Sequence, residues 1–203
     1  MKTKLRAVAS VLVTLSLLTG CSPIHEPELA GIIDRGTDPS VAAQVAYAKD
    51  HYKTPNKDEF GDLGGTDCVN FTSQTLLARG WKMTDGWAAS KGDGGFEYTR
   101  AWISSTGFRD YLAGHPELAT AVSWEHNNLV LPGDVVQFDW DGSGDRDHTA
   151  IVSGIEEDAT TGKRTILVSS HSPGAFDWPI TDVLAEHDSR TKVYFWRITS
   201  PTN

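Results

Sequence analysis

Residues 64–77 read GGTDCVNFTSQTLL, and this stretch decides how the rest of the chain is interpreted. The two leading glycines favour a tight turn, and Thr66 or Asp67 can cap the first amides of a helix that follows. Cys68 is therefore expected in the first turn, where the helix dipole favours the thiolate over the thiol. The stretch predicts a nucleophilic cysteine, and the alternative is a small buried hydrophobic residue. One face of the predicted helix carries Val69, Thr72, Ser73 and Leu76.

Length and composition are those of a single globular domain. The chain has 203 residues, of which 39% are hydrophobic and 22% charged, enough for one well-filled core. The formal net charge is −9, and no stripe of lysine and arginine appears along the chain. Because phosphate binding needs clustered positive charge, this composition argues against a nucleic-acid partner.

The first residues have the features of an export signal. A basic head precedes the apolar run 7–18, which is too short to span a bilayer as a stable anchor. Residues 18–21 read LTGC, which resembles the lipobox of bacterial lipoproteins, with Cys21 as the lipidated residue. We expect a signal peptide at 1–20, a tether at 21–37 and a domain at 38–203, held by lipid on the extracytoplasmic face of the cell membrane. The alternative is a plain signal peptide that happens to contain a cysteine.

The chain has two cysteines, so lipidation of Cys21 would leave Cys68 without a disulfide partner. A lone thiol in an exported protein suggests a chemical role. A Cys21–Cys68 disulfide is the structural alternative.

Helices are predicted before strands. Asp38 begins one helix, which ends before Pro55, and the helix of Cys68 ends at Gly80. Residues 81–95 are expected to form a loop and 99–114 another helix. This order predicts an α+β fold with an antiparallel sheet packed on the Cys68 helix. The predicted strands are 135–138, 149–155, 165–170 and 192–198.

Tryptophans gather around the predicted loop, and Trp87 and Trp102 are candidate substrate-binding residues. Such rings can line a groove for a sugar or a peptide. The alternative is that they close the core from outside.

Two histidines are candidates for the base that a thiol nucleophile needs. One predicted strand begins at His148, the next ends at His171, and a single turn joins them. In an antiparallel hairpin those ends lie side by side, so Cys68, His148 and His171 could form a relay. A one-residue slip in register would turn one histidine to the wrong face.

Four motifs in this order resemble the bacterial putative amidase domain family, a branch of the papain-like cysteine peptidases and amidases related to the CHAP peptidoglycan hydrolases. The resemblance covers about residues 41–198. The motifs are DCVNFTSQ at 67–74, PGD at 132–134 before a strand, DHTAIV at 147–152 and SHS at 170–172.

The resemblance implies a papain-like fold and a thiol amidase or endopeptidase. Cys68 would attack an amide carbonyl, His148 would act as base and then acid, and His171 would orient His148. The backbone amide of Cys68 would contribute to an oxyanion hole. The residue that orients His148, the third member of the relay, is the least certain assignment, because Asp147 or Ser170 could take this role instead of His171.

An acidic loop precedes His148 and resembles part of a calcium loop of the EF-hand kind. Ala150 stands where such a loop would have its bidentate glutamate, and a strand follows instead of a helix. An Asx-rich hairpin turn is therefore the preferred interpretation, no metal is assigned, and calcium binding is left open. The loop carboxylates are Asp139, Asp141, Asp145 and Asp147.

Together these features and the resemblance predict an exported, lipid-tethered, monomeric cysteine amidase or peptidase that needs no cofactor, with cell-wall peptidoglycan as its expected substrate. The alternative from another class is a non-catalytic surface module that binds a glycan or a peptide with the same fold.

Overall fold

The computed structural model describes residues 38–199. The predicted signal peptide at 1–20, the lipidated Cys21 and the tether at 21–37 lie outside the described residues. None of the helices within 38–199 combines the length and apolar composition that crossing a bilayer requires.

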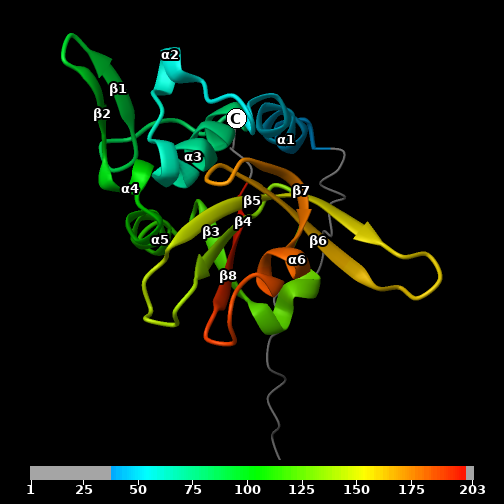
Figure 1. The fold of residues 1–203 in the computed structure, drawn as a ribbon. Coiled ribbons are helices and arrows are strands. Elements are labelled where there is room, and N and C mark those ends of the chain that lie inside the picture. Colours follow the sequence, from blue (N-terminus) through cyan, green and yellow to red (C-terminus); the bar gives the residue numbers. More distant parts are fainter. Residues whose placement is uncertain (1–37, 200–203) are drawn as a thin grey trace, which may run out of the picture. The chain divides into compact units, whose positions relative to one another are not determined.

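A six-stranded sheet forms the centre of the domain, and every neighbouring pair of its strands is antiparallel (Figure 1). The strand order is β3-β8-β4-β5-β6-β7. The strands are β3 (Ala119–Ser123), β4 (Val135–Asp139), β5 (His148–Glu157), β6 (Arg164–Ser170), β7 (Ala175–Pro179) and β8 (Lys192–Ile198).

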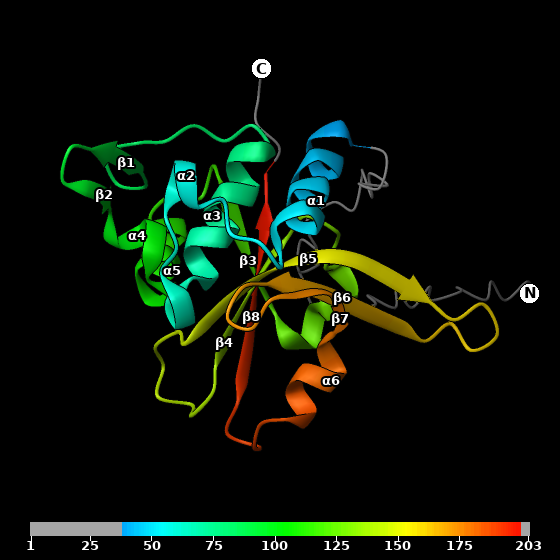
Figure 2. The ribbon, with the colours of Figure 1, turned by 45° about the horizontal axis from the view of Figure 1, so that its top comes forward.

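Helices cover both faces of this sheet. The group that contains α3 lies over one face and α6 lies over the other, as Figures 1 and 2 show. A separate two-stranded hairpin and two short 3-10 helices complete the described chain. The helices are α1 (Pro39–His51), α2 (Lys57–Phe60), α3 (Cys68–Ala78), α4 (Arg100–Ile103), α5 (Ser105–Ala113) and α6 (Ile180–Ala185); the 3-10 helices are η2 (Gly64–Thr66) and η3 (Trp124–Leu129); the hairpin strands are β1 (Ala89–Gly92) and β2 (Gly95–Tyr98).

The two faces of the sheet have separate hydrophobic cores, because successive side chains of a strand point to opposite sides. In β5, Ala150 and Val152 belong to the cluster that includes Val183 of α6. The intervening Ile151 packs with Phe71 of α3. The direction of a side chain along β5 therefore decides which core it joins.

Helix α3 is buried on all sides, since every residue from Cys68 to Leu76 is inaccessible or nearly so. Asp67 occupies the N-cap position, but its side chain makes no capping hydrogen bond. Gly80 follows the helix with φ of 107°, a left-handed conformation that favours glycine. The predicted helix boundaries are confirmed, whereas the predicted side-chain cap is not formed by Asp67.

The α+β class and the antiparallel sheet are confirmed; the papain-like fold stays a prediction. The expected loop at 81–95 contains β1 and leads into β2. The expected helix at 99–114 is two helices, because Ser104 adopts an extended conformation and caps α5. Strands β3 and β7 and helix α6 were not predicted.

Candidate active site

Cys68 is the first residue of α3, and its free thiol is 7% exposed. Its Sγ lies 3.8 Å from the Ser105 hydroxyl oxygen. Burial raises the pKa of the thiol, and the nearby Asp67 carboxylate raises it further. Hydrogen bonds from the Thr149 backbone N–H, the Ser105 hydroxyl and the Val69 N–H act in the opposite direction. Burial outweighs these donors, so the resting group is the thiol rather than the thiolate that the helix dipole alone would favour.

His148 is the first residue of β5 and lies on the sheet face that carries α6. Its ring centroid is 6.0 Å from those of Phe138 and Trp140. Burial, followed by the nearby His187, lowers the pKa of His148 to about 4, so the imidazole is neutral at pH 7. The ring borders a cavity of about 170 Å³ whose lining includes Ala150, Val168, Trp178, Val183 and Glu186.

The backbones of Cys68 and His148 lie near each other in the fold, but their side chains lie on opposite sides of the sheet. Cys68 Sγ and Thr149 Oγ1 both contact Ser105 Oγ, at 3.8 and 2.9 Å, so the sulfur lies near the residue that follows His148. Among the hydrogen bonds of residues 38–199, none joins the His148 ring to the sulfur. The thiol is on the α3 side of the sheet and the imidazole is on the α6 side.

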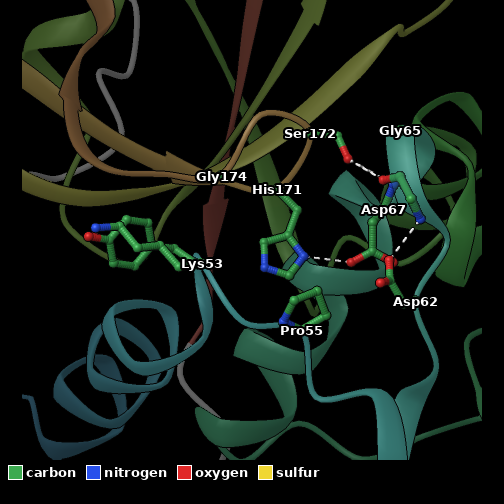
Figure 3. A pocket seen from close by; sticks show the side chains of 10 residues that line it. Lys53, Pro55, Asp62, Gly65, Asp67, His171, Ser172 and Gly174 are labelled. Atoms are coloured by element: carbon green, nitrogen blue, oxygen red, sulfur yellow. Dashed lines mark hydrogen bonds and ion pairs between the residues drawn. The ribbon is translucent and has the colours of Figure 1, made fainter.

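His171 is buried and held by oxygen atoms at both ring nitrogens. Its Nδ1 lies 2.5 Å from Asp67 Oδ2, and its Nε2 lies 2.8 Å from the backbone oxygen of His51. The ring also stacks on Phe71, with centroids 4.2 Å apart. Figure 3 shows His171 linked to Asp67 in this way. Both ring nitrogens are thus occupied by groups other than His148.

The register of β5 and β6 explains why the two histidines do not meet. Ile151 pairs with Ser169, and continuing this register places Ser172, not His171, opposite His148. The one-residue offset sends the two rings to opposite faces of the sheet. The structure therefore does not contain the predicted contact in which His171 orients His148.

The two other candidates for the third position also bond elsewhere. Asp147 Oδ2 accepts a hydrogen bond from the Trp140 N–H at 2.7 Å. Ser170 Oγ donates to the Pro173 carbonyl oxygen at 3.3 Å. Which residue, if any, orients His148 therefore stays a prediction.

An open pocket of about 440 Å³ lies over the His171–Asp67 pair (Figure 3). Asp67 adjoins Cys68, yet sequence reasoning considered it only as a helix cap. The sequence feature that could have identified Asp67 as a site residue is its position directly before the cysteine. The pocket lining also includes Tyr52, Lys53, Pro55, Asp62, Gly64, Gly65, Ser172 and Gly174.

The expectation that Trp87 and Trp102 line a substrate groove is wrong, because both side chains are 0% exposed. Trp87 Nε1 donates to Ser73 Oγ at 3.0 Å, and Trp102 Nε1 donates to Asn70 Oδ1 at 2.8 Å. Both rings belong to the core on the α3 side of the sheet. The alternative interpretation, in which these tryptophans close the core, is the correct one.

Among the described residues, one group of carboxylates is close enough to hold a cation. One ligand atom from each of its four aspartates lies within 4.8 Å of the others. The buried Asp139 carboxylate accepts from the backbone N–H groups of Ser143 and Gly144, at 3.0 and 2.9 Å. These bonds are those of an Asx-rich turn. The group is Asp139, Asp141, Asp145 and Asp147.

Comparison with known proteins gives one family and a distant relative. A sequence model described as a putative amidase domain matches residues 39–196. The uncharacterized protein YhbB of Bacillus subtilis (strain 168) is 28% identical over 116 residues, which are 53% of this chain and 35% of that protein. The chain thus spans about a third of the length of this curated relative. No solved structure matches the chain.

Proposed function

The chain belongs to the putative amidase domain family, and on this premise we propose that it is an exported cysteine amidase that hydrolyses an amide bond of cell-wall peptidoglycan. The family supports the coarser part of this statement, an amidase that cleaves a C–N bond. The cysteine chemistry, the substrate and the location are the finer parts, and each has its own support.

The observation that carries the cysteine chemistry is the shared contact of Cys68 and Thr149 with the Ser105 hydroxyl, whose oxygen lies 3.8 Å from Cys68 Sγ and 2.9 Å from Thr149 Oγ1. It holds a thiol at the start of a helix and beside the backbone of His148. Backbone amides at such a helix start can stabilise the oxyanion of a tetrahedral intermediate. A nucleophile, a neighbouring base and an oxyanion site are the parts that acyl transfer requires.

In the proposed mechanism, Cys68 Sγ attacks the amide carbonyl while His148 takes the thiol proton. His148 then returns this proton to the amine that leaves, and a thioester remains on Cys68. Water, deprotonated by His148, hydrolyses the thioester and releases the carboxylic acid. His148 is neutral at pH 7, and its ring faces the 170 Å³ cavity on the α6 side of the sheet. The mechanism therefore requires the His148 side chain to move to the α3 side, where the sulfur lies, when substrate binds.

The location and substrate are inferred from the N-terminal sequence. The basic head, the apolar run and the LTGC motif support export and lipidation of Cys21. A lipid on Cys21 would hold the domain at the outer face of the membrane, where peptidoglycan is the abundant amide-containing polymer. The proposed enzyme acts as a monomer, without a cofactor or a nucleic-acid partner.

A second candidate function is a non-catalytic module that binds a glycan or a peptide. The buried Cys68 thiol and the absence of a hydrogen bond to it from His148 favour this alternative within the described residues. The open pocket of about 440 Å³ over His171 would be its binding surface, since Trp87 and Trp102 are buried.

Digestion of purified peptidoglycan by the full chain separates the two candidates. The amidase predicts fragments with a new carboxylate and a new amine, which mass spectrometry assigns to one amide bond. Retention of the folded protein on the polymer without any new fragment would support the binding module and contradict the amidase.

A further inference from the structure

Cys68 is the end point of a chain of buried hydrogen bonds that starts at Trp196 in β8. Trp196 Nε1 donates to Gln137 Oε1 at 3.0 Å, and Gln137 Nε2 donates to Thr149 Oγ1 at 3.1 Å. The Thr149 hydroxyl lies 2.9 Å from Ser105 Oγ, which is 3.8 Å from the sulfur. All five side chains are buried.

The chemistry of these groups fixes the direction of the chain. An indole N–H can only donate, so it fixes the carbonyl end of the Gln137 amide. The amide nitrogen then donates to Thr149 Oγ1 and also, at 2.8 Å, to the Ser105 backbone oxygen. Thr149 in turn donates to Ser105 Oγ. Because Ser105 Oγ accepts that bond, its own proton is available to Cys68 Sγ, which accepts it once the thiol has lost its proton.

We propose that Ser105 is a further catalytic residue of the Cys68 site, whose hydroxyl donates to the sulfur and stabilises the thiolate formed when Cys68 is deprotonated. Thr149, Gln137 and Trp196 are positioning residues that hold this hydroxyl in its donating orientation. The inference rests on the proposed function, because it assigns a role within the same reaction.

The environment of the sulfur makes such a donor necessary. Burial disfavours the thiolate, as the raised pKa of Cys68 shows. Hydrogen bonds from Ser105, from the Thr149 N–H and from the Val69 N–H oppose this effect. Hydrogen bonds to a charged acceptor are roughly twice as strong as neutral ones, so their contribution grows as the proton leaves. They therefore favour the deprotonated state that precedes attack.

The test measures alkylation of Cys68 in the full chain as a function of pH. Iodoacetamide reacts with the thiolate, and peptide mapping by mass spectrometry separates Cys68 from Cys21. In Ser105→Ala, we expect the midpoint of the profile to rise by about one pH unit, with about tenfold slower labelling below the midpoint. We compare the midpoint rather than the labelling rate alone. Loss of the Ser105 hydroxyl enlarges the site, which could change reagent access, and therefore the rate, at every pH.

Ser73→Ala is the matched control. Ser73 is also fully buried, and its hydroxyl bonds to Trp87 Nε1 and the Trp102 backbone oxygen rather than to sulfur. We expect a comparable loss of stability and an unchanged midpoint. An equal shift in Ser73→Ala and Ser105→Ala would overturn the proposal, as would an unchanged midpoint in Ser105→Ala.

Thr149→Val tests the chain by a nearly isosteric change, and serves if Ser105→Ala does not fold. Loss of the Thr149 hydroxyl frees Ser105 to donate elsewhere, so the midpoint should rise by less than one unit. No rise would contradict the positioning role. The amidase function is tested separately, because an intact wild-type protein that cleaves no peptidoglycan would refute the amidase while a Ser105→Ala shift would still establish the contact with sulfur.

Discussion

His171 Nδ1 lies 2.5 Å from Oδ2 of Asp67, the residue immediately before Cys68. The other carboxylate oxygen of Asp67 accepts from the Leu63 N–H and from Asn70 Nδ2, both at 2.9 Å. This single carboxylate therefore connects the end of β6, the turn before α3 and the first turn of α3. The position of the predicted nucleophile depends on a buried pair that contains one of the predicted catalytic histidines.

The first prediction concerns the stability of this pair. His171→Ala removes one of the donors to the buried Asp67 carboxylate and the ring that stacks on Phe71, so we expect the free energy of unfolding to fall by about 3–5 kcal/mol. Urea denaturation followed by tryptophan fluorescence measures the loss. His126→Ala removes an exposed histidine whose Nδ1 lies 3.0 Å from Ser123 Oγ, and it should cost no more than about 0.5 kcal/mol. A loss below about 1 kcal/mol for His171→Ala would mean that the pair does not hold α3 in place.

The second prediction concerns stability at low pH. The pKa of His148 is lowered from 6.5 to about 4 in the folded chain, so between these values the unfolded chain binds the proton more readily. Stability should therefore fall as pH drops from about 6.5 to about 4, by at most about 3 kcal/mol from this residue. Unfolding curves of the wild type and His148→Phe at pH 7 and pH 4 measure the effect. If the stability of both proteins depended equally on pH, the loss at low pH would come from groups other than His148.

The third prediction concerns the pH dependence of hydrolysis. If His148 is the base, activity requires its neutral form, which the folded protein keeps down to about pH 4. The acidic limb of kcat/KM should then have its midpoint near pH 4, measured on peptidoglycan fragments with short exposures to acid. A midpoint near 6.5 would indicate a solvated histidine and would contradict this environment for the base.

The fourth prediction concerns Trp102, which has no exposed surface. Trp102→Phe loses the hydrogen bond to Asn70 Oδ1 and part of the packed ring, so we expect a loss of about 2 kcal/mol in stability. KM should stay within about twofold of the wild type, because the ring does not reach substrate. Trp124→Phe, at a ring that is 36% exposed, is the matched control for stability. A large rise in KM with unchanged stability would contradict this expectation and support the interpretation in which Trp102 lines a substrate groove.

Sequence patterns correctly predicted those helices and strands that are marked by the types of residue within them or at their ends. Strand β8 occupies 192–198 as predicted, because the β-branched and aromatic residues at 193–196 mark it. Helix α1 begins after Asp38 as predicted, and the Asp38 side chain caps it by accepting a hydrogen bond from the Ser40 N–H. Strands β3 and β7 were missed because they lie at the two edges of the sheet, where short segments need only one paired neighbour.

The candidate site depended on information that single residues do not contain. Cys68 could be placed at a helix start, but the burial that raises its pKa comes from α5 and β5 packing against it. His148 and His171 were correctly placed at strand ends, and the one-residue offset between them follows from the register of β5 and β6. Ser105 could not be found, because it reaches the sulfur from 37 residues away through tertiary packing.

The most direct test of the central claim is the rate at which the full chain releases new amino groups from purified peptidoglycan at pH 7. We expect release by the wild type and by Ser73→Ala, and a loss of at least about a thousandfold in Cys68→Ala, since removal of a covalent nucleophile has effects of this size. Release by folded Cys68→Ala at the wild-type rate would contradict the assignment of the sulfur as the nucleophile.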